Sequence, residues 1–244
     1  MMSSNVSMQV SKSSNYFGQI ENGKYHGLGI FHYSDGGVYD GQWMKNKRRG
    51  YGVFTKKNGD VYSGGWIDNG AQGKGKMVYS DGSVYEGDWF DDKKHGKGKL
   101  VREGFSYDGD WVNGEMTGMG KMHKQGTLFT GTMVAGLLTG QGEMVTQKGD
   151  SYVGAFVDSH LTGPGTMKWT NEVVYKGDWL LDTMHGKGSM SFKSGNKFNG
   201  NFKNGFMHGK GVNYEKREDG SFYKYKVTFN EGKLVKRKRR PDEE

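Results

Sequence analysis

The sequence predicts an all-β fold, an elongated single-layer twisted antiparallel sheet of tandem β-hairpins. Three observations predict it. A motif of about 23 residues recurs along the chain, glycine contributes 43 of 244 residues while proline contributes 2, and the 14% of aromatic residues exceed what a disordered chain would hold. Glycine combined with Tyr, Phe and Trp is typical of short strands joined by tight turns.

The repeat sets the register of the chain. Nine copies begin at Tyr16, Tyr39, Tyr62, Tyr85, Tyr107, Phe129, Tyr152, Tyr175 and Phe198. In every copy a glycine follows two residues after the first aromatic, a second lies nine residues further on, and a third comes two residues later. In the copy that begins at Tyr85 these are Gly87, Gly96 and Gly98.

Each copy predicts two strands. In the first strand Tyr85, Gly87 and Trp89 share one face, because side chains alternate along a strand. The glycines leave room for a ring of a neighbouring copy to lie on the backbone. Asp-Gly and Asn-Gly dipeptides predict hairpin turns between copies, at Asp35-Gly36, Asn58-Gly59, Asp81-Gly82 and Asp219-Gly220.

The repeat divides the chain into four segments. Residues 1–15 hold no copy and predict a disordered N-terminal segment, and residues 16–222 hold the nine copies. Residues 223–232 predict a capping strand, because Tyr225 stands where a copy would have glycine. Residues 233–244 predict a basic, disordered tail, which carries +3 of the net charge of +8.

Composition narrows the class of protein. The chain has no cysteine, which fits a reducing compartment, and no apolar run long enough for a secretory signal or a membrane span. We therefore expect a soluble, cytoplasmic protein. Outside the tail the chain is only mildly basic, so no nucleic-acid partner is expected.

The motif YxGxW followed by HGxG, as in Tyr85–Trp89 and His95–Gly98, resembles the MORN repeat (membrane occupation and recognition nexus) over residues 16–229. The resemblance implies stacked β-hairpins. Stand-alone arrays of this family are similar to scaffolds of cilia and flagella, of the cytoskeleton and of membrane contacts, and the catalytic modules found in other members match no segment here. The chain departs from the pattern at Phe129, Met133, Phe156 and Pro164.

No residue pattern predicts catalysis. His26, His95, His185 and His208 occupy one phase of the repeat, which favours a structural hydrogen bond near a turn and disperses them too widely to share a metal. The recurring GxG lacks the longer glycine pattern that phosphate sites use. We expect no catalytic residues, no metal and no cofactor.

The sequence offers two apolar surfaces for partners. The first is the aromatic face, which either packs on itself or forms a groove for a helix or strand of a partner; its residues are Tyr39, Trp43, Tyr62, Trp66, Tyr85, Trp89, Tyr107, Trp111, Tyr175 and Trp179. The second is an apolar ridge two residues before the second glycine, which either docks proteins or further copies of the chain, or folds back on its own strand. Its residues are Met116, Leu138, Leu161, Met184 and Met207, where earlier copies have Arg48, Ala71 and Lys94.

The basic tail offers a third surface. Such a basic segment attracts anionic lipid weakly, acts as a nuclear signal, or is simply a soluble end of the chain. Its residues are Lys236, Arg237, Lys238, Arg239 and Arg240. The function we expect is a non-enzymatic scaffold that docks protein partners in a cytoskeletal or ciliary (axonemal, flagellar) assembly. The alternatives are a peripheral adaptor for acidic phospholipids and a regulatory subunit of a separate enzyme.

Overall fold

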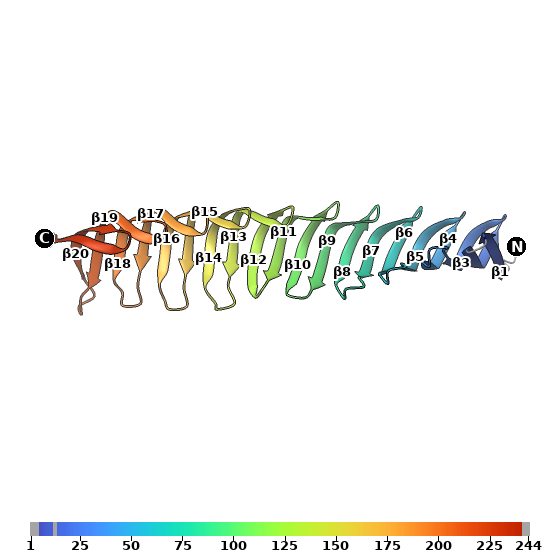
Figure 1. The fold of residues 1–244 in the computed structure, drawn as a ribbon, viewed down its shortest axis with the longest axis horizontal. Coiled ribbons are helices and arrows are strands. Elements are labelled where there is room, and N and C mark those ends of the chain that lie inside the picture. The colour runs from blue at the N-terminus through green and yellow to red at the C-terminus, as the bar shows by residue number, and fades with distance from the viewer. Residues whose placement is uncertain (1–4, 12–13, 241–244) are drawn as a thin grey trace. The chain divides into compact units, whose positions relative to one another are not determined.

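The computed structural model describes residues 5–11 and 14–240, and all of their regular elements are antiparallel β-strands. The described residues contain no helix, and therefore none long and apolar enough to cross a membrane. The chain divides into two compact units, residues 1–120 and 121–244. Within each unit the strands follow one another as hairpins in a single layer (Figure 1).

The first unit contains β1 (Asn5–Ser11), β2 (Ser14–Glu21), β3 (Lys24–His32), β4 (Val38–Met44), β5 (Lys47–Thr55), β6 (Val61–Ile67), β7 (Gly70–Val78), β8 (Val84–Phe90), β9 (Lys93–Arg102), β10 (Phe105–Val112) and most of β11 (Glu115–Lys124). The second contains β12 (Thr127–Val134), β13 (Leu137–Val145), β14 (Ser151–Val157), β15 (His160–Lys168), β16 (Val174–Leu180), β17 (Thr183–Ser191), β18 (Lys197–Lys203), β19 (Phe206–Lys216), β20 (Phe222–Asn230) and β21 (Lys233–Arg239).

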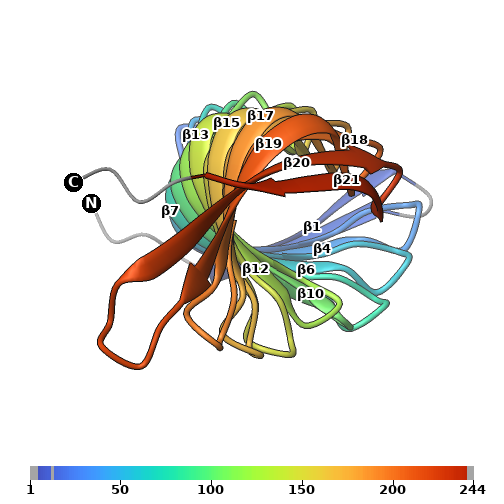
Figure 2. The same ribbon diagram turned by 90° about the vertical axis from the view of Figure 1, so that its left-hand side faces the viewer.

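The hairpin of β4 and β5 shows how one copy folds. Gly41 pairs with Gly52, and beyond a bulge Trp43 lies opposite Arg48, so that β5 has more residues than β4 over the same stretch. Gly50 lies in the bulge with a φ of 72°, a conformation that costs a residue with a Cβ. The second glycine of all nine copies has a positive φ, between 57° and 111°. Bulges increase the twist of a strand pair, and the strands of each unit are strongly twisted (Figure 2).

The core of each unit lies on the face that carries the repeat aromatics, called here the core face; the opposite face is called the outer face. A Cβ built on Gly41 or Gly52 would overlap the side chain of Tyr39, and the Tyr39 hydroxyl donates to the carbonyl of Gln42 at 3.0 Å. The glycines therefore make room for the tyrosine of their own hairpin. This corrects the prediction that they receive a ring from a neighbouring copy.

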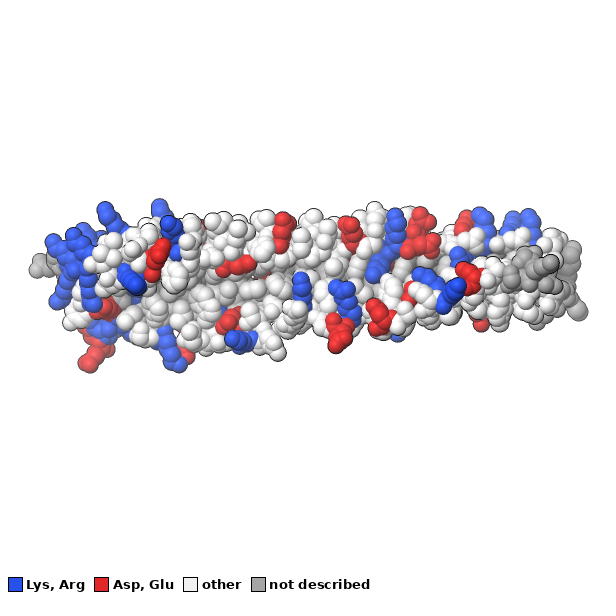
Figure 3. Space-filling view, viewed as in Figure 1, with Lys and Arg blue, Asp and Glu red and all other residues white. Residues whose placement is uncertain are grey.

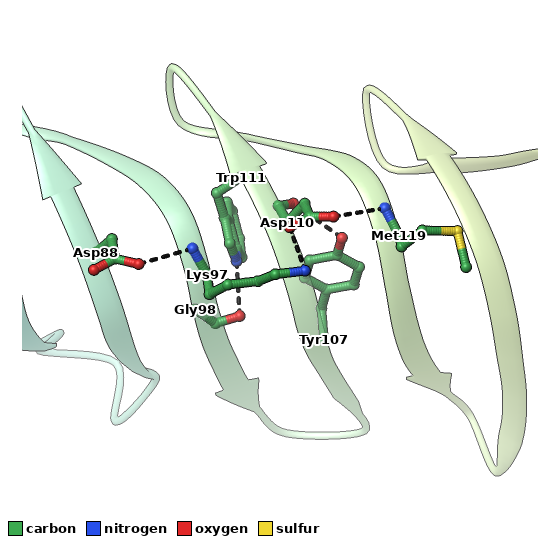
Figure 4. Close-up of polar contacts among 7 residues, drawn as sticks. All are labelled: Asp88, Lys97, Gly98, Tyr107, Asp110, Trp111 and Met119. Atoms are coloured by element: carbon green, nitrogen blue, oxygen red, sulfur yellow. Dashed lines mark hydrogen bonds and ion pairs between the residues drawn. The ribbon is translucent and has the colours of Figure 1, made fainter.

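Tryptophan connects one hairpin to the next. The Trp111 Nε1–H donates to the Gly98 carbonyl at 2.9 Å, while the Tyr107 hydroxyl donates to the Asp110 carbonyl at 3.0 Å (Figure 4). The Trp111 ring packs edge-on against Tyr107 and against Tyr85 of the preceding hairpin, with centroids 5.4 and 5.1 Å apart. Edge-to-face packing suits the quadrupoles of aromatic rings, so neighbouring copies stabilise each other.

The second unit repeats this arrangement with other residues at several positions. Met133, Phe156 and Phe202 stand at the Trp position of their copies. In the copy that begins at Phe129, Leu138 packs over Gly131 and Gly142, the place that a tyrosine ring takes elsewhere. In the copy that begins at Tyr175, the buried indole Nε1 of Trp179 has no hydrogen-bond partner.

The ends differ from the sequence prediction. Within residues 1–15, Asn5–Ser11 forms β1 and pairs with β2, and within 233–244, Lys233–Arg239 forms β21 and pairs with β20; residues 1–4, 12–13 and 241–244 lie outside the described residues. The capping strand predicted over 223–232 corresponds to β20, which is followed by this further strand. Neither end carries the repeat motif, and each is held by backbone bonds to the neighbouring strand, which need no particular side chains.

Candidate docking surfaces

The aromatic residues that the sequence offered as a groove form the core instead. Their side chains are buried, all with 6% exposure or less: Tyr39, Trp43, Tyr62, Trp66, Tyr85, Trp89, Tyr107, Trp111, Tyr175 and Trp179. A partner could touch these rings only by displacing the chain's own side chains. Of the two alternatives, self-packing is the one that the structure shows. Twist brings the rings of consecutive hairpins together, so that they cover one another without a second layer.

Two of the five residues of the apolar ridge belong to the core. Leu138 and Leu161 are buried, and Met116, Met184 and Met207 are half-buried. Each position lies directly across its hairpin from the Trp position, as Met184 does from Trp179. For Leu138 and Leu161 the structure therefore corrects the docking prediction, because both side chains fold back on their own hairpin.

Cations at the same position in the first unit also cover rings. The Arg48 Cζ lies 4.2 Å from the centre of the Trp66 ring, and the Lys94 Nζ lies 5.0 Å from that of Trp111. Burial lowers the pKa of Lys94. The apolar stems of Arg and Lys can pack like hydrophobic groups while their charges contact ring faces. At this position Arg, Lys, Leu and Met therefore all cover side chains of the core.

The basic tail is divided between the two faces of β21. Arg237 and Arg239 lie on the core face, where their Cζ atoms are 3.7 Å from the Tyr225 ring centre and 4.6 Å from that of Tyr223; Arg237 also contacts Glu215 at 2.8 Å. Lys236, Lys238 and Arg240 line a hollow on the outer face. The tail is thus two distinct groups of cations, not one cluster.

The four in-phase histidines lie half-buried beside the bulges. His26 contacts Glu21 at 3.0 Å, and the His208 Nδ1 accepts from the Glu231 backbone N–H at 3.4 Å. Across the part of the chain that the structure describes, no group of three or more potential ligands is placed to hold a metal ion. The histidine environments are those of polar residues near turns.

The sequence reasoning missed an exposed row of apolar side chains, called here the outer row. Its members directly follow the Trp position of the seven middle copies, whereas the first and last copies have Glu21 and Lys203 there. They are Met44, Ile67, Phe90 and Val112 in the first unit, and Val134, Val157 and Leu180 in the second. They are 39–54% exposed. Because side chains alternate along a strand, a residue after a buried Trp points to the outer face. An apolar residue directly after the tryptophan of consecutive copies was therefore the sequence signal for this row.

In the first unit the outer row borders an open groove of about 670 Å³. Met44, Ile67 and Leu28 line it with their exposed side chains, and the residues Trp43 and Trp66 border it although their side chains are buried on the core face. Its polar lining includes Gln42, whose Oε1 accepts from the Tyr51 backbone N–H at 3.0 Å. The groove is therefore apolar at its base, and the side-chain amide at its rim is engaged within the hairpin.

Further along the outer face of the first unit, charges alternate in sign. Lys97 contacts Asp110 at 2.5 Å, and Asp110 also accepts the Met119 backbone N–H at 2.8 Å (Figure 4). One hairpin earlier, Lys74 contacts Asp88 at 2.7 Å. This part of the face is electrostatically satisfied by its own residues.

Comparison with known proteins identifies the repeat. The family model for the MORN repeat matches nine consecutive segments, residues 16–38, 39–61, 62–84, 85–103, 107–125, 129–151, 152–173, 175–197 and 198–212. Their first residues are the nine copy starts predicted from the sequence. No curated protein matches the chain.

Solved structures add little. The TCP domain of SAS-4 from Drosophila melanogaster, in complex with a proline-rich motif of Ana2, is 11% identical, with 81% of this chain and 88% of that chain covered and a TM-score of 0.31. Virginiamycin B lyase from Staphylococcus aureus is 11% identical, with 96% and 82% covered and a TM-score of 0.14. Neither score is high enough to carry an argument.

The family match covers most of the chain, and the structure gives each matched segment the predicted pair of strands. Repeats of this kind are a non-enzymatic scaffold type that generally mediates interactions with proteins or membranes. The chain belongs to the MORN-repeat family.

Proposed function

We propose that this protein is a non-enzymatic scaffold that docks a protein partner on the outer row and the adjoining groove. The observation that supports the proposal is the regular exposure of apolar side chains at one position of consecutive hairpins, beside a groove of about 670 Å³. Folded proteins seldom leave such side chains aligned and uncovered unless they bind something.

The spacing of the row favours a helical partner. One hairpin advances the sheet by two strands, or about 10 Å. Seven residues of an α-helix advance by about 10.5 Å, so apolar residues at heptad spacing would meet Met44, Ile67, Phe90 and Val112 in turn. We therefore propose an amphipathic helix as the segment that docks.

The experiment is affinity capture of the full-length chain with identification of the bound proteins. Met44→Asp combined with Ile67→Asp should remove the docked partner and leave the β-type circular dichroism spectrum unchanged. Val101→Asp is the control. Val101 is 43% exposed, as the residues of the outer row are, but it lies at the end of its strand that is away from the outer row. If the double variant retains the same partners as the wild type, the proposal is wrong.

We further propose a cytoplasmic location in a cytoskeletal or ciliary assembly. The support is the likeness of stand-alone MORN arrays to scaffolds of such assemblies. The tagged protein should remain with the detergent-insoluble cytoskeleton or axoneme, and Met44→Asp/Ile67→Asp should release it. A diffuse, detergent-extractable wild-type protein would contradict this location.

A further inference from the structure

The excess positive charge of the chain belongs almost entirely to the second unit. Residues 121–244 contain 20 Lys and Arg against 13 Asp and Glu, a net charge of +7, whereas residues 1–120 contain 15 against 14, a net charge of +1. Lys and Arg side chains gather over the C-terminal strands of the second unit (Figure 3).

The strands of this end align five cations on the outer face. Lys210, Lys226, Lys236, Lys238 and Arg240 line one hollow of about 540 Å³ on β19, β20 and β21. The strand register places Lys226 directly opposite Lys238, and Thr228 opposite Lys236 and Lys210. Like charges directly opposite one another destabilise a strand pair.

The hollow contains no acidic side chain to offset them. None of its lining residues is Asp or Glu, and the nearby carboxylate of Glu215 contacts Arg237 on the core face. A comparable hollow in the first unit, of about 600 Å³, has Lys74, Lys76, Lys97 and Lys99 but also Glu86 and Asp108. The buried Nε of Arg240 has no hydrogen-bond partner.

These cations flank an open strand edge. Among the described strands, β21 pairs with β20 alone and is the last strand at this end of the second unit (Figure 2). The residues of β21 are exposed. An open edge offers unpaired backbone N–H and C=O groups to another strand. Lysine on such an edge repels strands that are basic, which includes β21 of a second copy.

We propose that an acidic extended peptide of a partner protein adds to β21 as a further strand, with carboxylates at alternate positions against the cations of the hollow. Lys236 and Lys238 lie on one face, two residues apart, so an added strand meets them with every second side chain. Its backbone satisfies the edge while its carboxylates lie beside Lys236 and Lys238 and offset the positive charge that these lysines share with Lys226. This surface is distinct from the outer row, so either site can fail without the other.

Several features favour a strand over an anionic membrane. A bilayer offers no backbone groups to pair with the edge. Arg237 and Arg239 face away from the hollow and stack on tyrosines. The five consecutive basic residues 236–240 therefore cannot all contact one flat membrane surface.

The test measures binding of fluorescent peptides to the full-length chain at physiological salt. A peptide in which glutamate alternates with threonine should bind. The same peptide with every backbone nitrogen methylated keeps the charges and their order but has no N–H group that can pair with a strand. It should bind about tenfold more weakly.

Charge variants complete the test. Lys236→Glu combined with Lys238→Glu should abolish binding of the glutamate–threonine peptide. Lys57→Glu combined with Lys148→Glu makes the same change in net charge at exposed turn residues and should retain binding. Equal affinity for the two peptides would overturn strand addition, and so would equal binding by both charge variants. Tight binding to phosphatidylserine vesicles without any affinity for the peptides would identify a membrane surface instead.

Discussion

In the seven copies that begin with tyrosine, the ring fits two glycines so closely that neither can carry a side chain. Tyr39 covers Gly41 and Gly52, and its hydroxyl donates to a carbonyl three residues ahead. The same hydrogen bond recurs from the first tyrosine of seven copies, at 2.8–3.1 Å. A Cβ on the third glycine would have to displace a buried ring, which close packing does not allow.

Gly52→Ala should therefore destabilise the fold by about 2–4 kcal/mol, measured as a lower urea midpoint by tryptophan fluorescence. Gly70→Ala is the control, because its Cβ would meet nothing closer than 3.6 Å and its φ is not in the left-handed region. We expect that variant to be neutral or about 0.5 kcal/mol more stable. Equal losses in both would contradict the packing argument.

The tryptophans offer a second comparison between single residues. Trp43 donates from Nε1 to the Gly29 carbonyl at 2.9 Å, whereas the buried Nε1 of Trp179 has no partner. Trp43→Phe should therefore lower the free energy of unfolding by about 1 kcal/mol more than Trp179→Phe. Urea denaturation followed by circular dichroism measures both, and a larger loss for Trp179→Phe would be the contrary result.

At the scale of the hairpin, the turn of one copy is bonded to the strand of the copy before it. Asn46 accepts the Tyr25 backbone N–H at 2.7 Å, Asn69 accepts that of Arg48 at 2.9 Å, and Asp92 accepts that of Ala71 at 2.8 Å. Asn46 has a φ of 68°, which Asn and Asp tolerate better than other residues with a side chain. These side chains therefore shape their own turn and join it to the preceding hairpin.

Asn46→Ala should remove the acceptor and add backbone strain, for a loss of about 1–3 kcal/mol. Asn46→Asp keeps the acceptor, as Asp92 does naturally, and should stay within about 0.5 kcal/mol of the wild type. Thermal unfolding of the two variants gives the comparison. The proposed role of the turn is wrong if aspartate is as harmful as alanine.

The hairpins were predictable from the sequence because glycine and aromatic residues recur at fixed distances, and the nine predicted copy starts are confirmed by the family match. The coverage of the aromatic face was not predictable. Alternation shows that Tyr39 and Trp43 share a face, but not that rings of neighbouring hairpins lie 5.3 Å apart and exclude a partner. Strands β1 and β21 could not be predicted either, since their own residues carry no repeat.

Across the whole molecule, the pKa values of the repeated tyrosines are shifted in the same direction. Burial raises the pKa of Tyr16, Tyr39, Tyr107 and Tyr152 from 10.0 to about 12, and it raises the pKa of Tyr62, Tyr85 and Tyr175 as well. A raised pKa in the fold means that the fold favours the protonated phenol. The resulting stability is complete below pH 10 and is lost as the pH rises through about 12.

We therefore expect the urea midpoint to fall steeply between pH 10 and about 12, with phenolate absorbance rising as the protein unfolds. Tyr39→Phe removes one of these groups, so its midpoint should depend less steeply on pH over the same window. A midpoint that stays constant through this window would contradict the prediction.

The order of the strands also determines how the molecule responds to load. Within each unit, every strand is bonded to the strands next to it in the sequence. A force that draws the chain ends apart therefore acts across these bonds and opens them in succession, not all at once. Each released copy, about 23 residues, adds up to roughly 75 Å of extended chain. Such a protein would lengthen stepwise under tension, hairpin by hairpin, and would limit the force passed between whatever it connects.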